Sequence, residues 1–224
     1  MREAVIVSTA RTPIGKAFRG AFNDTQAQEM AGHAIAEAVK RSKVSKEEID
    51  DVIIGAAGQQ GSQQGNIARQ SLLRAGLPVS VAGMSLDRQC ASGMMAIATA
   101  AKEITEDCMT ITVGGGVESV SLVRNENFRM DRARDPWLEE NIPSLYMTMI
   151  ETAENVAKRY GISREAQDEY SLQSQMRTAK AQQNGYMDKE IVPLKSTMKY
   201  KDKETGEISS HDVCIEKDEG NRPS

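Results

Sequence analysis

Short apolar runs alternate with segments of helical periodicity along the first half of the chain. Four nearly continuous apolar runs have the pattern of strands buried on both faces of a sheet. They are residues 4–9, 51–55, 82–86 and 109–113. Helical spacing of apolar side chains fills the intervals between them, at residues 25–43, 66–75 and 92–104. Strands that alternate with helices indicate βαβ units, so we expect an α/β fold of layered βαβ units with a mostly parallel sheet.

The pattern changes after about Gly116. Residues 124–140 mix charged and amide side chains without a period, which predicts a polar excursion over the surface. The elements expected after it are helices at residues 149–160 and 163–183, a strand at residues 191–194, and a hairpin at residues 198–215 with its turn at residues 202–206. This second part of the chain therefore predicts a smaller α+β region.

Charge and cysteine usage narrow the class of protein. The 28 basic and 32 acidic side chains give a net charge of −4, which argues against a nucleic-acid or anionic membrane surface. The longest apolar stretch, residues 94–101, is far shorter than the roughly 20 residues that a membrane span needs. The N-terminus shows no signal-peptide pattern. Three cysteines without paired spacing favour a reducing compartment, so we expect a cytoplasmic protein.

The strongest candidate for chemistry is Cys90, which lies between an expected strand and an Ala-rich helix. The unpaired N–H groups and the dipole at the start of a helix favour an anion, so this position suits a thiolate that attacks a carbonyl carbon. Small residues follow Cys90, which would let a flat acyl group approach. From these features alone, a small buried structural cysteine is an equally good interpretation. Cys108 and Cys214 lack such a setting, and we expect them to be inert.

Other motifs are weaker candidates. The glycine-rich turns at residues 55–61 and 114–116 lack the dinucleotide spacing GxGxxG, so close packing of strands and helices explains them more simply. With two histidines in the chain, a Cys–His pair must use His33, His211 or a residue outside these 224. His211 and Cys214 form a bare HxxC, which does not predict a zinc site. We expect no metal and no cofactor.

Five separated motifs resemble, in order, those of the thiolase family of acetyl-CoA and 3-ketoacyl-CoA acyltransferases. They occupy residues 10–16, 65–70, 88–93, 114–119 and 152–155. The resemblance implies that Cys90 is the nucleophile that takes the acyl group, and that its N–H contributes to an oxyanion hole. It also implies that coenzyme A thioesters are the substrates. Two acyl-CoA molecules would be condensed, or a 3-ketoacyl-CoA cleaved, as in fatty acid metabolism.

The same resemblance divides the chain and adds two binding residues. Residues 1–118 would form the nucleophile-bearing N-terminal half, and residues 119–224 the loop domain that covers the active site. Arg222 matches an arginine that contacts the nucleotide end of coenzyme A, and Met149 matches a methionine that shapes the acyl pocket. Thr148 departs from the family, because many biosynthetic relatives have histidine there. Thiolases usually assemble as homodimers or homotetramers, so we expect a homo-oligomer.

The resemblance further implies a second half that these residues do not match. A thiolase continues into another βαβ half with an Asn-containing oxyanion motif, a catalytic histidine and a second catalytic cysteine. We therefore expect the acid/base residues in a longer polypeptide, and no turnover by residues 1–224 alone. Two alternatives stay open. One is a non-catalytic, thiolase-derived module that binds coenzyme A or a partner protein, and the other is a related condensing enzyme such as a ketoacyl synthase.

Overall fold

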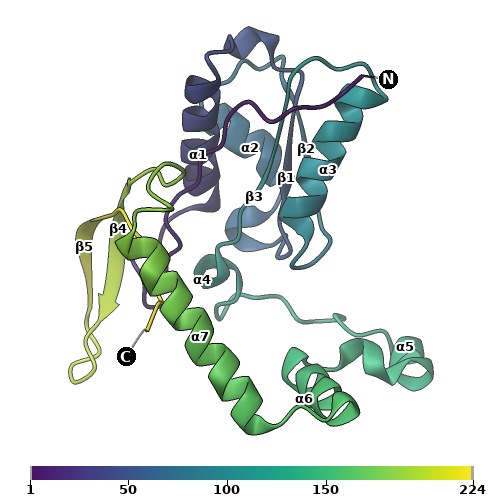
Figure 1. Ribbon diagram of the computed structural model, residues 1–224, viewed down its shortest axis with the longest axis vertical. Helices are drawn as coiled ribbons and strands as arrows, with labels where there is room; N and C mark the ends of the chain where they lie inside the picture. Colours follow the sequence, from purple (N-terminus) through teal and green to yellow (C-terminus); the bar gives the residue numbers. More distant parts are fainter. Residues whose placement is uncertain (1, 223–224) are drawn as a thin grey trace. The chain divides into compact units, whose positions relative to one another are not determined.

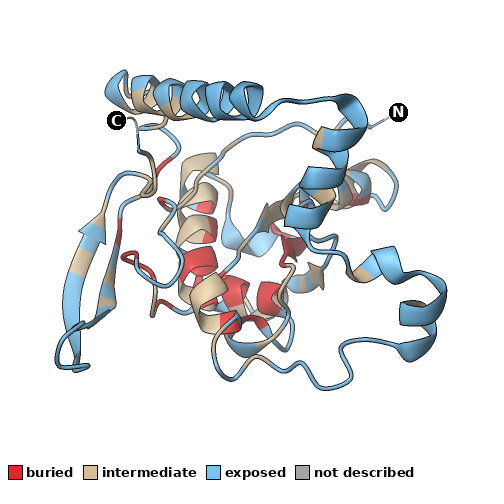
Figure 2. Cartoon of the chain, turned by 90° about the horizontal axis from the view of Figure 1, so that it is seen from below, coloured by how far each residue is buried: buried red, intermediate tan, exposed pale blue. Residues whose placement is uncertain are grey.

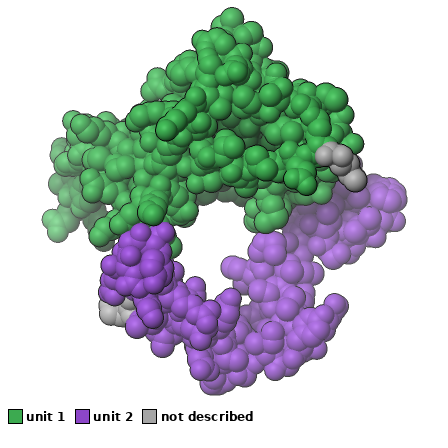
Figure 3. Space-filling model, turned by 45° about the horizontal axis from the view of Figure 1, so that its top comes forward, with its two compact units in different colours: residues 1–128, 187–220 green, residues 129–186, 221–224 purple. Residues whose placement is uncertain are grey.

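The computed structural model describes residues 2–222 (Figure 1). Their contacts divide the chain into two compact units, which are coloured separately in Figure 3. The first unit comprises Met1–Phe128 and Met187–Gly220, and the second comprises Arg129–Tyr186 and Asn221–Ser224. Each unit is described by itself below. The division at residue 118 that the resemblance implies stays a prediction.

A three-stranded parallel sheet forms the centre of the first unit. Its strands are β1 (Asp51–Gly55), β2 (Ala82–Leu86) and β3 (Thr112–Gly116), in the spatial order β2–β1–β3. Asp51 on the central strand lies opposite Ala82 on one side and Thr112 on the other. The parallel sheet and its alternation with helices confirm the expected α/β fold class.

Helices cover both faces of this sheet. They are α1 (Ala27–Ser42), α2 (Ile67–Arg74) and α3 (Ser92–Thr105). Figure 1 shows α1 and α2 on one side of the strands and α3 on the other. Because successive strand residues point to opposite faces, Val52 and Ile54 join the core cluster under α1 and α2, whereas Ile53 packs against Ala96 and Ala100 of α3. This buried centre is red in Figure 2.

Local signals explain where the helices begin and end. Asn66 caps α2 because its side-chain oxygen accepts a hydrogen bond of 3.1 Å from the N–H of Arg69. Helix α1 ends at Lys43, which adopts a left-handed conformation with φ of 61°. Three short elements complete this region: the 3₁₀ turns η1 (Lys46–Glu48) and η2 (Gly61–Gln63), and helix α4 (Val120–Val123).

The strand expected at residues 4–9 is wrong. Residues 2–10 form no regular secondary structure, and Val5, Ile6 and Val7 are 72%, 78% and 69% exposed. A strand requires a hydrogen-bonded neighbour, and no described segment pairs with these residues. Their apolar sequence therefore predicted a strand, but residues 2–222 supply no neighbouring strand to pair with it.

The strand expected at residues 109–113 lies three residues further along, because the carboxylate of Asp50 holds its start. Oδ2 of Asp50 accepts hydrogen bonds of 2.7 Å from the N–H of Thr110 and 3.1 Å from that of Ile111, so the ladder of β3 begins at Thr112. Burial on both faces is confirmed for β1 alone. β2 and β3 are the edge strands of this sheet and remain partly exposed.

An antiparallel hairpin completes the first unit. It consists of β4 (Leu194–Lys201) and β5 (Ile208–Ile215). The predicted hairpin is thus confirmed and begins earlier than expected. The separate strand at residues 191–194 is wrong, because Ile191 makes one isolated bridge with Arg11, and Pro193 has no N–H with which to continue a ladder. Leu194 packs with Ala21, Phe22 and Met30 in a second core cluster.

The second unit is helical. Its elements are α5 (Pro136–Asn141), η3 (Pro143–Tyr146), α6 (Met149–Tyr160) and α7 (Arg164–Gln183). The two long helices are confirmed. The polar excursion expected at residues 124–140 is mostly exposed and contains no strand. Within it, Asp135 accepts a hydrogen bond from the N–H of Leu138, and Pro136 begins the short helix α5. Within residues 2–222, no helix is long and apolar enough to cross a membrane.

Candidate active site

Cys90 lies on a short turn between the end of β2 and the start of α3. The turn is closed by its own side chains. Oδ1 of Asp87 accepts a hydrogen bond of 2.6 Å from the N–H of Gln89. Oγ of Ser92 accepts one of 2.8 Å from the N–H of Arg88 and donates one of 2.6 Å to the carbonyl of Gln89. The candidate nucleophile is therefore carried by a hydrogen-bonded turn.

The residue before Cys90 has an uncommon backbone conformation. Gln89 has φ of 50°, in the left-handed region that side chains other than Gly, Asn and Asp rarely adopt. The side chain of Cys90 is exposed and its thiol is free. A sharp turn of this kind raises the next side chain above the sheet, as nucleophile turns do in other enzymes. The structure thus contradicts the alternative of a buried structural cysteine.

Two glycines place this turn directly against the ends of β1 and β3. A Cβ on Gly55, the last residue of β1, would lie 2.2 Å from the carbonyl carbon of Ser92. A Cβ on Gly116, the last residue of β3, would lie 3.0 Å from the Cα of Gly93. No side chain fits at Gly55, so the glycine-rich turns serve close packing, as the sequence indicated. Cys90 therefore follows the carboxyl end of a parallel sheet, where active sites of α/β proteins lie.

The backbone around Cys90 leaves its own N–H free of the turn. The hydrogen bonds within the turn use the N–H groups of Arg88, Gln89, Ala91 and Ser92, and not that of Cys90. Helix α3 follows at Ser92, and its N-cap Ala91 makes no side-chain cap. Unused N–H groups at a helix start stabilise negative charge. This arrangement is suited to an oxyanion that develops next to the thiol.

The histidines of the chain make their hydrogen bonds elsewhere. Nε2 of His33 on α1 lies 3.0 Å from the carbonyl of Pro193. Nε2 of His211 on β5 lies 2.9 Å from Oγ of Ser209. Cys108 and Cys214 are exposed and free. Within residues 2–222, no group of three or more His, Cys, Asp and Glu side chains could hold a metal ion.

The two residues assigned by resemblance to coenzyme A binding both lie in the second unit. Met149 is the first residue of α6 and is 74% exposed. Thr148 before it caps the helix in a capping box with Glu151, so the position that departs from the family has a local structural role. Arg222 is exposed, and its backbone N–H donates a hydrogen bond of 2.7 Å to Oε1 of Gln175.

A network around the exposed carboxylate of Glu118, which the sequence did not predict, orders the loop after β1. Glu118 accepts hydrogen bonds of 2.8 Å from the N–H of Ala57, 3.2 Å from that of Gly58 and 2.9 Å from Nε2 of Gln63. Gln63 is 1% exposed, and its Oε1 accepts a hydrogen bond from the N–H of Ser119. The polar run at residues 59–64 contains one buried glutamine, Gln63, and no feature of the sequence distinguishes it from its neighbours.

A second network joins segments that are 200 residues apart in the sequence. The guanidinium of Arg11 makes two parallel hydrogen bonds of 2.7 and 2.9 Å with the carboxylate of Asp218, and its Nε lies 2.8 Å from Glu190. The hydrogen bond with Asp218 is the main cause that raises the pKa of Arg11. Burial acts to raise the pKa of Asp218, but hydrogen bonds from Arg11 and from the N–H of Ile14 outweigh it and hold that pKa below its ordinary value.

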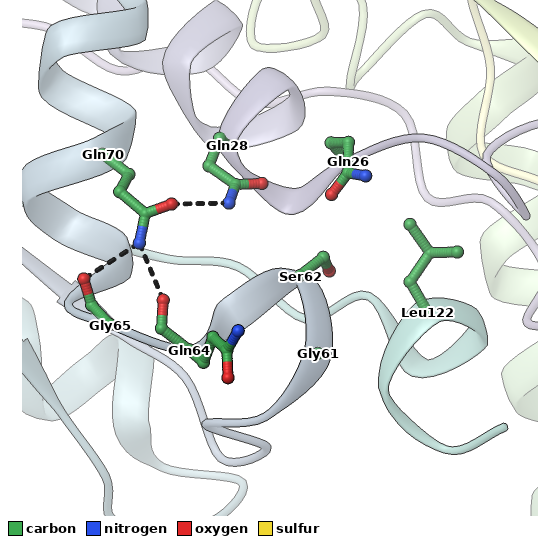
Figure 4. Close-up of a pocket in the computed structure, with 8 residues that line it drawn as sticks. All are labelled: Gln26, Gln28, Gly61, Ser62, Gln64, Gly65, Gln70 and Leu122. Atoms are coloured by element: carbon green, nitrogen blue, oxygen red, sulfur yellow. Dashed lines mark hydrogen bonds between the residues drawn. The ribbon is translucent and has the colours of Figure 1, made fainter. Parts of the chain in front are cut away.

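A pocket of about 570 Å³ in the first unit is lined by amide side chains (Figure 4). Its lining residues are Gln26, Gln28, Gly61, Ser62, Gln64, Gly65, Gln70 and Leu122. The amides bond one another: Nε2 of Gln28 donates to Oε1 of Gln70 at 2.7 Å, and Nε2 of Gln70 donates to two backbone carbonyls. The residues that line the pocket include no charged side chain, histidine or cysteine, so Cys90 remains the candidate reactive centre.

Comparison with known proteins identifies the family. The family described as thiolase, N-terminal domain, matches residues 4–224. The chain belongs to the thiolase family. It is 40% identical over 200 residues to a 3-ketoacyl-CoA thiolase of Bacillus subtilis. This alignment covers 88% of this chain and 50% of that protein. It is also 40% identical over 204 residues to an acetyl-CoA acetyltransferase of Cupriavidus necator, covering 87% of this chain and 51% of that relative.

A solved structure gives the same result for the thiolase fold. The crystal structure of the Bacillus anthracis acetyl-CoA acetyltransferase superposes with a TM-score of 0.78 at 35% sequence identity. The match covers 99% of this chain and 56% of that chain. Residues 1–224 thus span about half the length of the thiolases that they match.

Proposed function

We propose that these residues carry the acyl-accepting half of a thiolase active site, with Cys90 as the nucleophile. The observation that carries the proposal is the turn at residues 87–92, which exposes the thiol of Cys90 where β2 ends and α3 begins. The N–H of Cys90, unused within that turn, supports a role in an oxyanion hole. The relatives' names, 3-ketoacyl-CoA thiolase and acetyl-CoA acetyltransferase, support acyl-CoA as the substrate class.

The reaction follows from a thiolate at this position. Sγ of Cys90 attacks the thioester carbonyl carbon of an acyl-CoA, and the tetrahedral oxyanion then expels the thiolate of coenzyme A, which takes up a proton. The acyl group is left on Cys90 as a thioester. A second acyl-CoA that has lost a proton from its α-carbon attacks this thioester and forms 3-ketoacyl-CoA, while the thiol of Cys90 is released. In the opposite direction, coenzyme A cleaves the 3-ketoacyl-CoA.

We further propose that residues 1–224 do not turn over by themselves. In the described residues, neither histidine ring bonds to Cys90, so neither is in place to accept the proton of the thiol. An apolar trough of about 780 Å³ lies along residues 4–17, α1 and β3, where the side chains of residues 5–7 are exposed. A trough of this kind suits an additional strand from the remainder of a thiolase, which would also bring the acid/base residues.

Activity of a completed protein tests the proposal. Residues 1–224 are joined to the part of the Bacillus subtilis thiolase that lies beyond the matched region, and cleavage of a 3-ketoacyl-CoA is measured. We expect activity that Cys90→Ala lowers by at least about a thousandfold with folding intact, because the nucleophile is lost. Cys108→Ala serves as the matched control and should leave the rate unchanged. Equal activity of the Cys90→Ala and parent proteins would refute the assignment.

The alternative is a non-catalytic module that binds coenzyme A or a partner. The turn at residues 87–92, which presents the thiol of Cys90 and leaves its N–H unused, favours the catalytic proposal over it, because binding alone requires no such arrangement. The module predicts that the folded, completed protein binds acetyl-CoA but forms no covalent adduct. Isothermal titration combined with intact mass spectrometry separates the two functions.

A further inference from the structure

The backbone of Gln89 is held from both ends of the nucleophile turn. Its N–H donates a hydrogen bond of 2.6 Å to Oδ1 of Asp87, and its carbonyl accepts one of 2.6 Å from Oγ of Ser92. Gln89 has φ of 50°, which a residue with a side chain keeps only when its surroundings hold it there. The two hydrogen bonds that Gln89 makes with Asp87 and Ser92 supply that constraint.

Ser92 is itself fixed by burial. It is 4% exposed, and its backbone packs against Gly55, where a Cβ would lie 2.2 Å from the carbonyl carbon of Ser92. Its hydroxyl also accepts a hydrogen bond of 2.8 Å from the N–H of Arg88. Ser92 thus connects two residues of the turn, through its hydroxyl, to the end of β1, through its backbone. Cys90 is the next residue after Gln89, so its position depends on this connection.

We propose that Ser92 and Asp87 are positioning residues for Cys90. They hold Gln89 in its left-handed conformation, and this conformation directs the thiol and the N–H of Cys90 to the same acyl group. Ser92 acts from the buried side of the turn, and Asp87 acts from its start. The inference rests on the proposed role of Cys90 as nucleophile, and it assigns the geometry of that nucleophile to two side chains that do not react.

The three cysteines of this chain make an internal comparison possible. All are exposed and free, so iodoacetamide reaches Cys90, Cys108 and Cys214 in one sample. Peptide mass spectrometry gives a separate alkylation rate for each. We expect Cys90 to react fastest, because its thiol lies at the start of α3, where unpaired N–H groups stabilise a nearby anion. A Cys90 that reacts no faster than the other two would count against the proposed function itself, whatever the variants do.

Variants of the turn then test the positioning role. Ser92→Ala removes the hydroxyl, and we expect the alkylation rate of Cys90 to fall by about tenfold, since the turn no longer holds its thiol at the start of α3. The rates of Cys108 and Cys214 should not change. Ser92→Thr keeps the hydroxyl and should restore the rate, which a purely structural role of the side chain would not explain. Ser171→Ala, an exposed serine on α7, is the matched control.

Circular dichroism shows whether Ser92→Ala folds. If it does not fold, Asp87→Asn tests the positioning role in its place. The asparagine side chain has the shape of aspartate but no charge, so it weakens the hydrogen bond from the N–H of Gln89. We expect a smaller, selective fall of about threefold at Cys90. The inference is overturned if a folded variant leaves Cys90 as reactive as before, or if the rates of all three cysteines change together.

Discussion

Two carboxyl groups of the first unit, those of Asp51 on β1 and Glu103 on α3, are buried. They are 9% and 8% exposed, and Oε2 of Glu103 has no hydrogen-bond partner in the described structure. Burial raises the pKa of Glu103, and the nearby charges of Asp51 and Asp107 raise it further. Burial likewise raises the pKa of Asp51, against a hydrogen bond from the N–H of Val52. These groups therefore lower the stability of the folded chain at neutral pH, when they are charged.

Glu103→Gln should stabilise the chain at neutral pH. The pKa of Glu103 is higher in the folded than in the unfolded state, so the folded state binds the proton more tightly and stability falls as the pH rises above about 4.3. We expect the variant to gain about 1 kcal/mol at pH 7, a rise in Tm of about 2–4 °C. The gain should vanish near pH 4. The exposed Glu154→Gln is the control, and a gain that does not depend on pH would contradict this account.

Asp218→Asn should have the opposite pH dependence. The pKa of Asp218 is lowered in the folded chain, so its ion pair with Arg11 stabilises the fold above the unfolded pKa of about 3.9 and is lost as the pH falls through the folded pKa. We expect the variant to lose about 1–2 kcal/mol at pH 7 and little below pH 3. Thermal unfolding at both pH values measures this, with Asp188→Asn as the exposed control. Equal losses at both pH values would contradict it.

Apolar periodicity predicted those elements that find their partners within residues 2–222. The three helices around the sheet, the two long helices of the second unit and the hairpin lie close to their expected positions. The strand at residues 4–9 failed because periodicity reports which side chains are apolar and not which neighbour is present. The start of β3 failed because the carboxylate of Asp50, a long-range partner, sets where its ladder begins.

The core between α2 and the sheet offers a direct test at the scale of elements. Leu72 is fully buried in the main core cluster, whereas its neighbour Leu73 is 41% exposed. We expect Leu72→Ala to lower the free energy of unfolding by about 2–5 kcal/mol, because it leaves a cavity. Leu73→Ala should cost less than about 1 kcal/mol. Urea denaturation compares the two, and similar losses would show that α2 does not pack as described.

At the scale of the whole molecule, the sequence predicted a candidate nucleophile, Cys90, but not the structure around it. Cys90 was identified from its place before a helix and from the family motifs. The hydrogen bonds of Ser92, the carboxylate network of Glu118 and the pairing of Arg11 with Asp218 were missed, because each joins residues whose proximity only the fold determines. The roles of Met149 and Arg222 remain predictions from resemblance.

If the second half of a thiolase supplies the missing strand, amide hydrogen exchange in the N-terminal segment should slow. Residues 4–9 have no ladder partner in the described structure, so their amide hydrogens should exchange rapidly in residues 1–224 alone. Joined to the second half of the Bacillus subtilis thiolase, the same amides should be protected by at least about a hundredfold, as those of a sheet are. Hydrogen exchange followed by mass spectrometry measures both. Unchanged exchange would show that the trough is not filled by a strand.

The proposal that Cys90 is the nucleophile is tested most directly by identifying the residue to which an acyl group becomes attached. The completed protein is incubated with acetyl-CoA, quenched in acid and digested, and the three cysteine peptides are analysed by mass spectrometry. We predict one acetyl group on the peptide that contains Cys90 and none on those of Cys108 and Cys214, with no acetylation of the Cys90→Ala variant. Acetylation of another residue, or a folded and active protein whose Cys90 never carries the acetyl group, would contradict the account.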